Sequence, residues 1–174
     1  MSPIALQEKE YYEAKYNISQ YPELPFCIVI PSYNNAKNNL HIKNIRSVLM
    51  QDYSNYHVVF IDDASTDGTG DQIEQYLASN QTRLPSSRYT IIKNKVQQRA
   101  MPNLRMAAKQ YCRPEEIFLI AYGDDELVGR QVLRLFSAIF QREKAWFVYS
   151  NFLNIRHSVG YSRPFPLATI KNNK

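Results

Sequence analysis

The chain has 174 residues, of which 44% are hydrophobic and 13% aromatic, a composition typical of one globular domain rather than of a disordered segment. Its formal net charge of +5 comes from lysines and arginines scattered along the sequence without a dense basic run, and this pattern argues against nucleic-acid binding. No segment approaches the roughly 18 consecutive apolar residues of a transmembrane helix.

The sequence contains two cysteines, Cys27 and Cys112. Cys27 lies inside an apolar run typical of a buried strand, and we interpret both residues as ordinary thiols that form neither a disulfide nor a metal framework. The charged N-terminal region lacks the apolar core of a secretory signal. A reducing compartment and a cytoplasmic location are therefore expected.

Residues 1–25 are polar and rich in tyrosine, and we interpret them as an N-terminal extension with a short helix over 4–16. From Phe26 onward, apolar runs alternate with amphipathic segments. Strands are expected at 26–30, 56–61, 88–94, 117–121 and 145–150, and helices at 38–50, 71–77, 103–111 and 132–140. Such alternation predicts an α/β fold with a mainly parallel central sheet.

Three polar clusters follow the first, second and fourth expected strands, at 31–34, 62–63 and 124–125. Right-handed crossovers place the carboxyl ends of these strands on one edge of the sheet, where open α/β sheets bind ligands. We therefore expect the three clusters to lie together.

The first two clusters have side chains suited to a nucleoside. Tyr33 offers a ring for stacking, while Asn34 and the carboxylates of Asp62 and Asp63 can hydrogen bond to the edge of a base. Ser65 or Thr66 is expected to cap the next helix. An ordinary loop is the alternative for the first cluster, and the glycine-rich phosphate-binding motifs are absent.

The third cluster is the sequence GDDEL at 123–127, which begins as an apolar strand ends. The adjacent carboxylates of Asp124 and Asp125 are ligands that Mg²⁺ and Mn²⁺ prefer, and such a cation is often shared with substrate phosphates. A simple turn that precedes the next helix is the alternative.

The motifs FCIVIPSYN (26–34), VVFIDDASTDGT (58–69) and AYGDDEL (121–127) together resemble those of family 2 glycosyltransferases of GT-A fold, over residues 26–165. The resemblance implies a Rossmann-like three-layer sandwich and an inverting, hexosyltransferase-type reaction. The donor would be a nucleotide-diphosphate sugar, often a UDP-sugar, assisted by Mn²⁺ or Mg²⁺. Residues 26–150 would form the donor-binding core, and 151–174 the truncated start of an acceptor-side region.

The resemblance also implies roles for single residues. Pro31 and Tyr33 would line the base pocket, Asp63 would bind the base edge beside Asp62, and Asn103 would lie near the donor. Arg99 would reach the base or the phosphates. Asp124 would contact the ribose or the metal, and Asp125 the metal.

Two departures from the family pattern stand out. Tyr122 replaces the first acid of the usual metal motif, and residues 151–174 contain no Asp or Glu that could act as general base. We interpret His41, His57 and His157 as structural or surface residues rather than as the base. A catalytically incomplete nucleotide-sugar-binding module is therefore the alternative function.

Other functions are weighed against the same motifs. A nucleotidyltransferase would need a glycine-rich basic loop after the first strand, which this chain lacks. The acceptor of a glycosyltransferase (glycan, protein or lipid) is not specified by the sequence.

Overall fold

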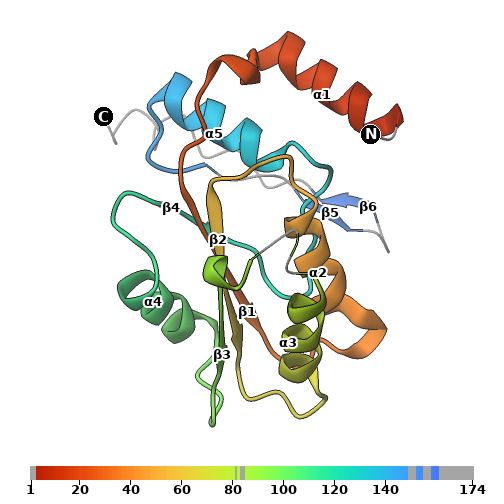
Figure 1. Cartoon of the computed structure of the whole chain (residues 1–174), viewed down its shortest axis with the longest axis vertical. Coiled ribbons are helices and arrows are strands. Elements are labelled where there is room, and N and C mark those ends of the chain that lie inside the picture. The colour runs from red at the N-terminus through yellow and green to blue at the C-terminus, as the bar shows by residue number, and fades with distance from the viewer. Residues whose placement is uncertain (1–2, 81, 83–84, 149–151, 155–157, 161–174) are drawn as a thin grey trace.

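The computed structural model of the chain describes residues 3–80, 82, 85–148, 152–154 and 158–160 (Figure 1). At its centre lies a four-stranded parallel sheet with the order β3-β2-β1-β4. The strands are β1 (Phe26–Ser32), β2 (Tyr56–Asp62), β3 (Tyr89–Lys93) and β4 (Ile117–Ile120). The prediction of a mainly parallel sheet is confirmed, and the first strand extends through Pro31 instead of ending there.

Helices cover both faces of this sheet, as the three-layer prediction requires. Alternate side chains of β1 divide between two cores: Ile28 and Ile30 face one cluster, while Cys27 and Val29 face the other. The first cluster contains residues of α2 (Leu40–Leu49), α3 (Thr69–Ser79) and α5 (Val132–Glu143), and the second contains residues of α4 (Ala100–Gln110). Short 3₁₀ turns occur at Ile18–Gln20, Lys37–Asn39 and Ser86–Arg88. None of the helices described here combines the length and apolarity that a bilayer-spanning segment needs.

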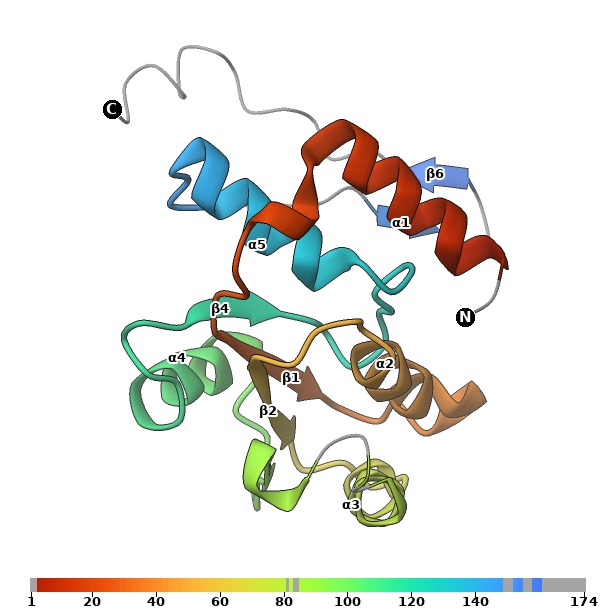
Figure 2. The same cartoon turned by 45° about the horizontal axis from the view of Figure 1, so that its top comes forward.

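The helical part of the N-terminal extension packs on α5, and the last residue of the extension, Pro25, accepts a hydrogen bond from the Ile117 N–H of β4. Helix α1 (Pro3–Tyr16) lies beside α5 in both views (Figures 1 and 2). Ser137 on α5 donates a hydrogen bond to the Pro22 carbonyl at 3.0 Å and accepts one from the Leu24 N–H at 3.1 Å. Ile18 is fully buried. The extension is therefore tied to the core, while the boundary at residue 25 stays a prediction.

The predicted fifth strand is wrong for residues 145–148, which form no strand; residues 149 and 150 lie outside the described part of the chain. Trp146 is fully exposed and Phe147 is 71% exposed. A strand needs a neighbour to satisfy its backbone, and an aromatic-rich pattern does not reveal whether one is present. A small antiparallel pair that the sequence did not predict follows instead, β5 (Phe152–Asn154) with β6 (Ser158–Gly160).

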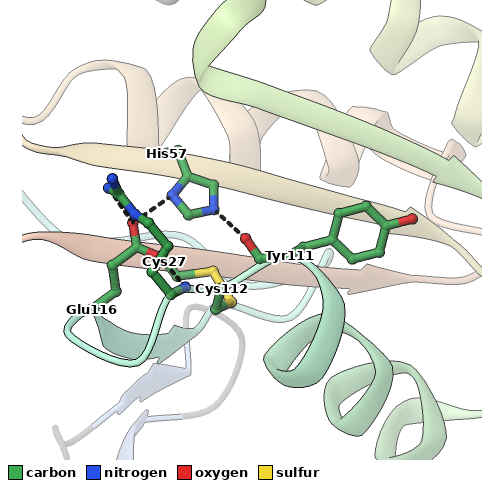
Figure 3. Close-up of a disulfide and its surroundings, with 6 residues drawn as sticks. Cys27, His57, Tyr111, Cys112 and Glu116 are labelled. Carbon is green, nitrogen blue, oxygen red and sulfur yellow. Dashed lines mark hydrogen bonds and ion pairs between the residues drawn. A yellow bond between two sulfur atoms is a disulfide. The ribbon is translucent and has the colours of Figure 1, made fainter.

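The prediction of two ordinary thiols is also wrong: Cys27 and Cys112 form a disulfide (Figure 3). Cys27 is buried on the face of β1 that α4 covers, and Cys112 follows α4, so their Cα atoms lie 5.6 Å apart despite a separation of 85 residues. Two isolated cysteines in a sequence carry no information about this proximity. The expectation of a reducing compartment rested on free thiols, and the disulfide removes that reason for it.

Candidate functional site

The loops that follow β1 and β2 brace each other at the carboxyl edge of the sheet. The Asp63 N–H donates to the Ser32 carbonyl at 2.8 Å, and the Asn34 N–H donates to Ser65 Oγ at 2.9 Å. Thr66 N–H returns a hydrogen bond to Asn34 Oδ1 at 2.9 Å. The side-chain oxygen of Asn34 is therefore occupied by the loop that follows β2. The backbone φ of Asn34 is 52°, a left-handed conformation that asparagine adopts more readily than most residues. The two predicted clusters are held as one rigid unit.

Helix α3 begins differently from the prediction. Ser65 and Thr66 do not cap it; Asp67 Oδ1 instead accepts hydrogen bonds from the Thr69 N–H at 3.0 Å and from its hydroxyl at 2.6 Å. The other oxygen, Asp67 Oδ2, accepts from the Ala36 N–H at 2.8 Å, so the same carboxylate joins the β1 loop to α3. The N-cap residue itself is Gly68, and Asp67 aligns the β1 loop with the start of the helix.

Asp62 is buried against the first turn of α3. A Cβ on Gly70 would lie 2.5 Å from Asp62 Oδ2, so only glycine allows the helix to approach this carboxylate. The other oxygen accepts from the Ser65 N–H at 3.4 Å. Carboxylates near a helix N-terminus are stabilised by the helix dipole. The contacts of Asp62 are therefore with the start of α3 and the loop before it, beside the predicted base site.

Asp63 organises the loop that joins β3 to α4. Its carboxylate, 3% exposed, accepts hydrogen bonds from the N–H groups of Gln98 at 2.9 Å and Arg99 at 2.7 Å, and from Asn94 Nδ2 at 2.7 Å. Burial alone would raise the pKa of this carboxyl, but these hydrogen bonds and the neighbouring Asn103 amide lower it below its usual value. Asn94 also donates to Asn103 Oδ1 at 2.9 Å. The predicted residues Asp63, Arg99 and Asn103 are thus brought together around one ionised group.

Arg99 has a backbone conformation that ordinary residues avoid, with φ 70° and ψ 172°. This region is essentially reserved for glycine and costs a side-chain-bearing residue about 1–3 kcal/mol. The hydrogen bond from Arg99 N–H to Asp63 holds the strained backbone, and the side chain is exposed at the same edge as the other clusters. A strained, exposed arginine is a candidate ligand-binding residue.

Replacing Arg99 with glycine is expected to raise the free energy of unfolding by about 1 kcal/mol, because relief of strain exceeds the extra chain entropy that glycine brings. Arg99→Ala removes the same side chain but keeps the strain, so it should give no such gain. Urea unfolding of both variants measures the difference. Equal stabilities of the glycine and alanine variants would show that the backbone at position 99 is not strained.

The acidic turn follows β4 and packs directly on the last residues of β1. The Gly123 N–H donates to the Pro31 carbonyl at 3.0 Å, and a Cβ on Gly123 would lie 2.6 Å from the Ser32 Cβ. Glycine is required for this close approach. Asp124 and Asp125 are both exposed there, and desolvation together with the negative charge of Asp124 raises the pKa of Asp125.

A cation bound here would offset the negative charge of Asp124 that disfavours ionisation of Asp125. The carboxylate oxygens of Asp124 and Asp125 suit a hard divalent ion such as Mg²⁺ or Mn²⁺, which also retains water or phosphate ligands. Tyr122, which occupies the place of a third acid, is 42% exposed and adds no charge. The residues present therefore fit a metal held by two carboxylates and completed by a bound phosphate group.

Asn44 on α2 holds the acidic turn and was missed by the sequence analysis. Its Nδ2 donates to two carbonyls that bracket the turn, those of Tyr122 and Asp125, both at 2.8 Å. Asn44 is 1% exposed. Further along α2, Ser47 Oγ accepts from the Leu127 N–H at 3.0 Å. One turn later, Gln51 donates to the Gly129 carbonyl at 2.7 Å.

A signal for this arrangement was present in the sequence. The polar residues His41, Asn44 and Gln51 are spaced so that they lie on one side of the helix expected at 38–50, with Gln51 just beyond its end. The remaining residues with helical periodicity in this segment are apolar, which indicates that the helix is packed against the core. Buried polar side chains at such positions must find partners. His41, fully buried, lies 2.9 Å from the Asn35 carbonyl and 3.1 Å from Gln72 Oε1, which confirms a structural role; His157 lies outside the described residues.

The predicted residues thus share one edge of the sheet but differ in exposure. Pro31, Asp62, Asp63 and Asn103 are buried, while Tyr33, Asn34, Arg99, Asp124 and Asp125 are exposed. The buried group shapes the loops, and the exposed group is free to contact a ligand. That these residues bind a nucleotide sugar stays a prediction at this point.

Comparison with known proteins places the chain among glycosyltransferases. The sequence model of the family described as "Glycosyl transferase family 2" matches residues 27–169. The "Putative colanic acid biosynthesis glycosyl transferase WcaA" of Escherichia coli (strain K12) is 39% identical over 69 residues, which is 40% of this chain and 22% of that protein.

Solved structures share the fold. The crystal structure of S. aureus TarS 1–349 in complex with UDP-GlcNAc is 23% identical over 70% of this chain and 32% of that chain, with a TM-score of 0.56. Mannosyltransferase PcManGT from Pyrobaculum calidifontis in complex with GDP-Man and Mn²⁺ is 22% identical over 75% of this chain and 39% of that chain, with a TM-score of 0.58. The chain therefore spans well under half the length of these relatives.

Proposed function

Because the chain belongs to glycosyltransferase family 2, we propose that it binds a nucleotide-diphosphate sugar, a UDP-sugar by preference, and serves the inverting transfer of its hexosyl group to an acceptor. The observation that carries the proposal is the exposed Asp124–Asp125 pair, which Gly123 packs against the carboxyl end of β1. The complexes of TarS with UDP-GlcNAc and of PcManGT with GDP-Man and Mn²⁺ support it.

Each exposed residue has a task in this proposal. Tyr33 stacks on the base, and Asn34, held by Thr66, keeps the β1 loop in place beside it. Asp63 fixes the loop 94–99 and so presents the Arg99 side chain to the phosphates. Asp124 and Asp125 hold Mn²⁺ or Mg²⁺. When bound, this ion neutralises the diphosphate and assists its departure as a leaving group.

A second candidate function is donor binding without transfer. Tyr122 leaves the metal with two protein carboxylates, and residues 151–174, where the resemblance places the acceptor side, contain no Asp or Glu. We assign no general base in this chain; such a base is typically worth about 10²–10⁴-fold in rate. UDP release from a UDP-sugar above background, abolished by Asp124→Ala, would favour the enzyme over the binding module.

Asp125→Asn tests the proposed metal site by thermal unfolding. For the unsubstituted chain, UDP with Mn²⁺ should raise the melting temperature more than UDP with a chelator, because a ligand that binds only the folded state stabilises it. The variant should lose this metal-dependent part.

Without metal and ligand, Asp125→Asn should be no less stable than the unsubstituted chain at neutral pH. The pKa of Asp125 is raised in the folded state, so its contribution to stability falls as the pH rises through that value, and Asn removes this loss. Glu126→Gln, next to the pair, is the matched control and should keep the full shift. A metal-dependent shift that survives in Asp125→Asn would contradict the proposed ligand.

A further inference from the structure

A second group of potential ligands, Cys27, His57 and Cys112, lies at the amino end of the sheet, opposite the carboxyl edge that carries the acidic turn. Figure 3 shows the three side chains together. Cys27 is the second residue of β1, His57 is the second residue of β2, and Cys112 follows α4. A sulfur of each cysteine and a ring nitrogen of His57 all lie within 4.8 Å of one another. Three separate elements thus bring two sulfurs and an imidazole to one point.

The imidazole of His57 is held by a contact at each of its ring nitrogens. Its Nδ1 lies 3.0 Å from Glu116 Oε1, and its Nε2 lies 3.2 Å from the Tyr111 carbonyl, so both ring nitrogens face acceptors. The Glu116 side chain is 1% exposed and also pairs with Arg113 at 2.8 Å. A histidine whose second nitrogen is held by a buried carboxylate is the usual arrangement around a bound zinc ion.

The His57 side of the group borders a surface hollow of about 300 Å³. His57 and Glu116 line this hollow together with the cationic side chains of Arg88 and Arg113. Cys27 itself is fully buried, while Cys112 and His57 are partly exposed. The group is therefore nearest to solvent at Cys112 and His57.

We propose that the reduced form of the Cys27–Cys112 pair, together with His57, is a binding site for Zn²⁺. A dithiol reductant supplies two electrons and two protons, is itself oxidised to a disulfide, and converts the cystine to two thiols. Zn²⁺ then displaces both thiol protons and binds the two thiolates and Nε2 of His57. The ion takes the place of the contact between Nε2 and the Tyr111 carbonyl, and the Nε2 proton passes to solvent.

The geometry of the backbone suits such a site. Zinc–sulfur distances of about 2.3 Å and zinc–nitrogen distances of about 2.0–2.1 Å are typical. The 5.6 Å between the Cα atoms of the two cysteines therefore allows both sulfurs to reach one ion. Glu116 is the positioning residue: it keeps the other ring nitrogen of His57, so that the imidazole enters the site in one tautomer. The fourth position is left to water. Soft thiolates select Zn²⁺ over Mg²⁺, which separates this site from the acidic turn.

Titration of the whole chain with Co²⁺, in its oxidised form and after reduction by a phosphine, tests the proposal without any substitution. The reduced chain should bind one ion and show the thiolate-to-cobalt absorption and the visible bands of tetrahedral cobalt, which Zn²⁺ then displaces. The oxidised chain should show neither.

Variants locate the site. Cys112→Ser should abolish the thiolate absorption, and Glu116→Gln should weaken Zn²⁺ binding about 10–100-fold while the absorption remains. Asp125→Asn is the control for the acidic turn and should leave the absorption unchanged. A reduced chain without the absorption, or a Cys112→Ser variant that keeps it, would overturn the proposal.

Discussion

Replacing Asp63 with asparagine is expected to lower the free energy of unfolding by about 3 kcal/mol at neutral pH. The carboxylate accepts hydrogen bonds from two backbone N–H groups, those of Gln98 and Arg99, and from the Asn94 amide. An asparagine offers one oxygen and turns an N–H donor toward groups that also donate, so buried donors lose their partner. Urea unfolding measures the loss, and the affinity for a UDP-sugar should fall with it because the loop that carries Arg99 is released.

The effect should depend on pH in one direction. The pKa of Asp63 is lowered in the folded state, so its contribution is complete above the ordinary aspartate value of 3.8 and is lost as the pH falls through the lower folded value. The difference between the unsubstituted chain and the variant should therefore shrink in acid. Asp71→Asn is the control: that side chain is 75% exposed and pairs with Lys93, so it should cost less than about 0.5 kcal/mol. Equal losses in the two variants would show that Asp63 does not hold the loop.

Asn44→Ala is expected to cost about 2 kcal/mol and to weaken metal binding about 10–100-fold, although Asn44 touches no predicted ligand atom. Its amide binds the carbonyls of Tyr122 and Asp125, so its removal leaves both without this donor and frees the turn that carries the acids. The Mn²⁺ affinity in the presence of UDP, followed by the relaxation of water protons, reports the second effect separately from stability.

Asn80→Ala is the matched control for Asn44. It removes an asparagine from the end of α3, where the amide donates to the Tyr76 carbonyl far along the chain from the acids. It should change stability modestly and leave Mn²⁺ affinity unchanged. If Asn44→Ala also leaves Mn²⁺ affinity unchanged, the hydrogen bonds from α2 do not position the acidic turn.

The parallel sheet could be predicted because its two central strands are buried on both faces and appear in the sequence as continuous apolar runs, 26–30 and 56–61. Once these strands are parallel, the clusters at their carboxyl ends must share an edge, and the structure places 31–34, 62–63 and 124–125 there. Residue type and strand order suffice for this part of the site.

The remaining features depend on contacts between distant segments. Asp63 is buried among N–H donors, whereas Asp125 is exposed. The sequence cannot reveal this difference, because each is the second residue of an Asp-Asp dipeptide. Nor does the sequence reveal that Cys27 meets Cys112, because that depends on how α4 lies on β1. The prediction of a strand at 145–150 was wrong at 145–148 for a related reason. The local sequence pattern does not show whether a neighbouring strand is available for pairing.

Calorimetric titration of the chain with a UDP-sugar, in Mn²⁺ and again in a chelator, tests the central claim most directly. The account predicts saturable binding of one donor molecule that is tighter in Mn²⁺, with the metal dependence absent in Asp125→Asn. No saturable binding at millimolar donor, or binding with the same affinity in Mn²⁺ and chelator, would contradict a metal-assisted nucleotide-sugar site at the carboxyl edge of this sheet.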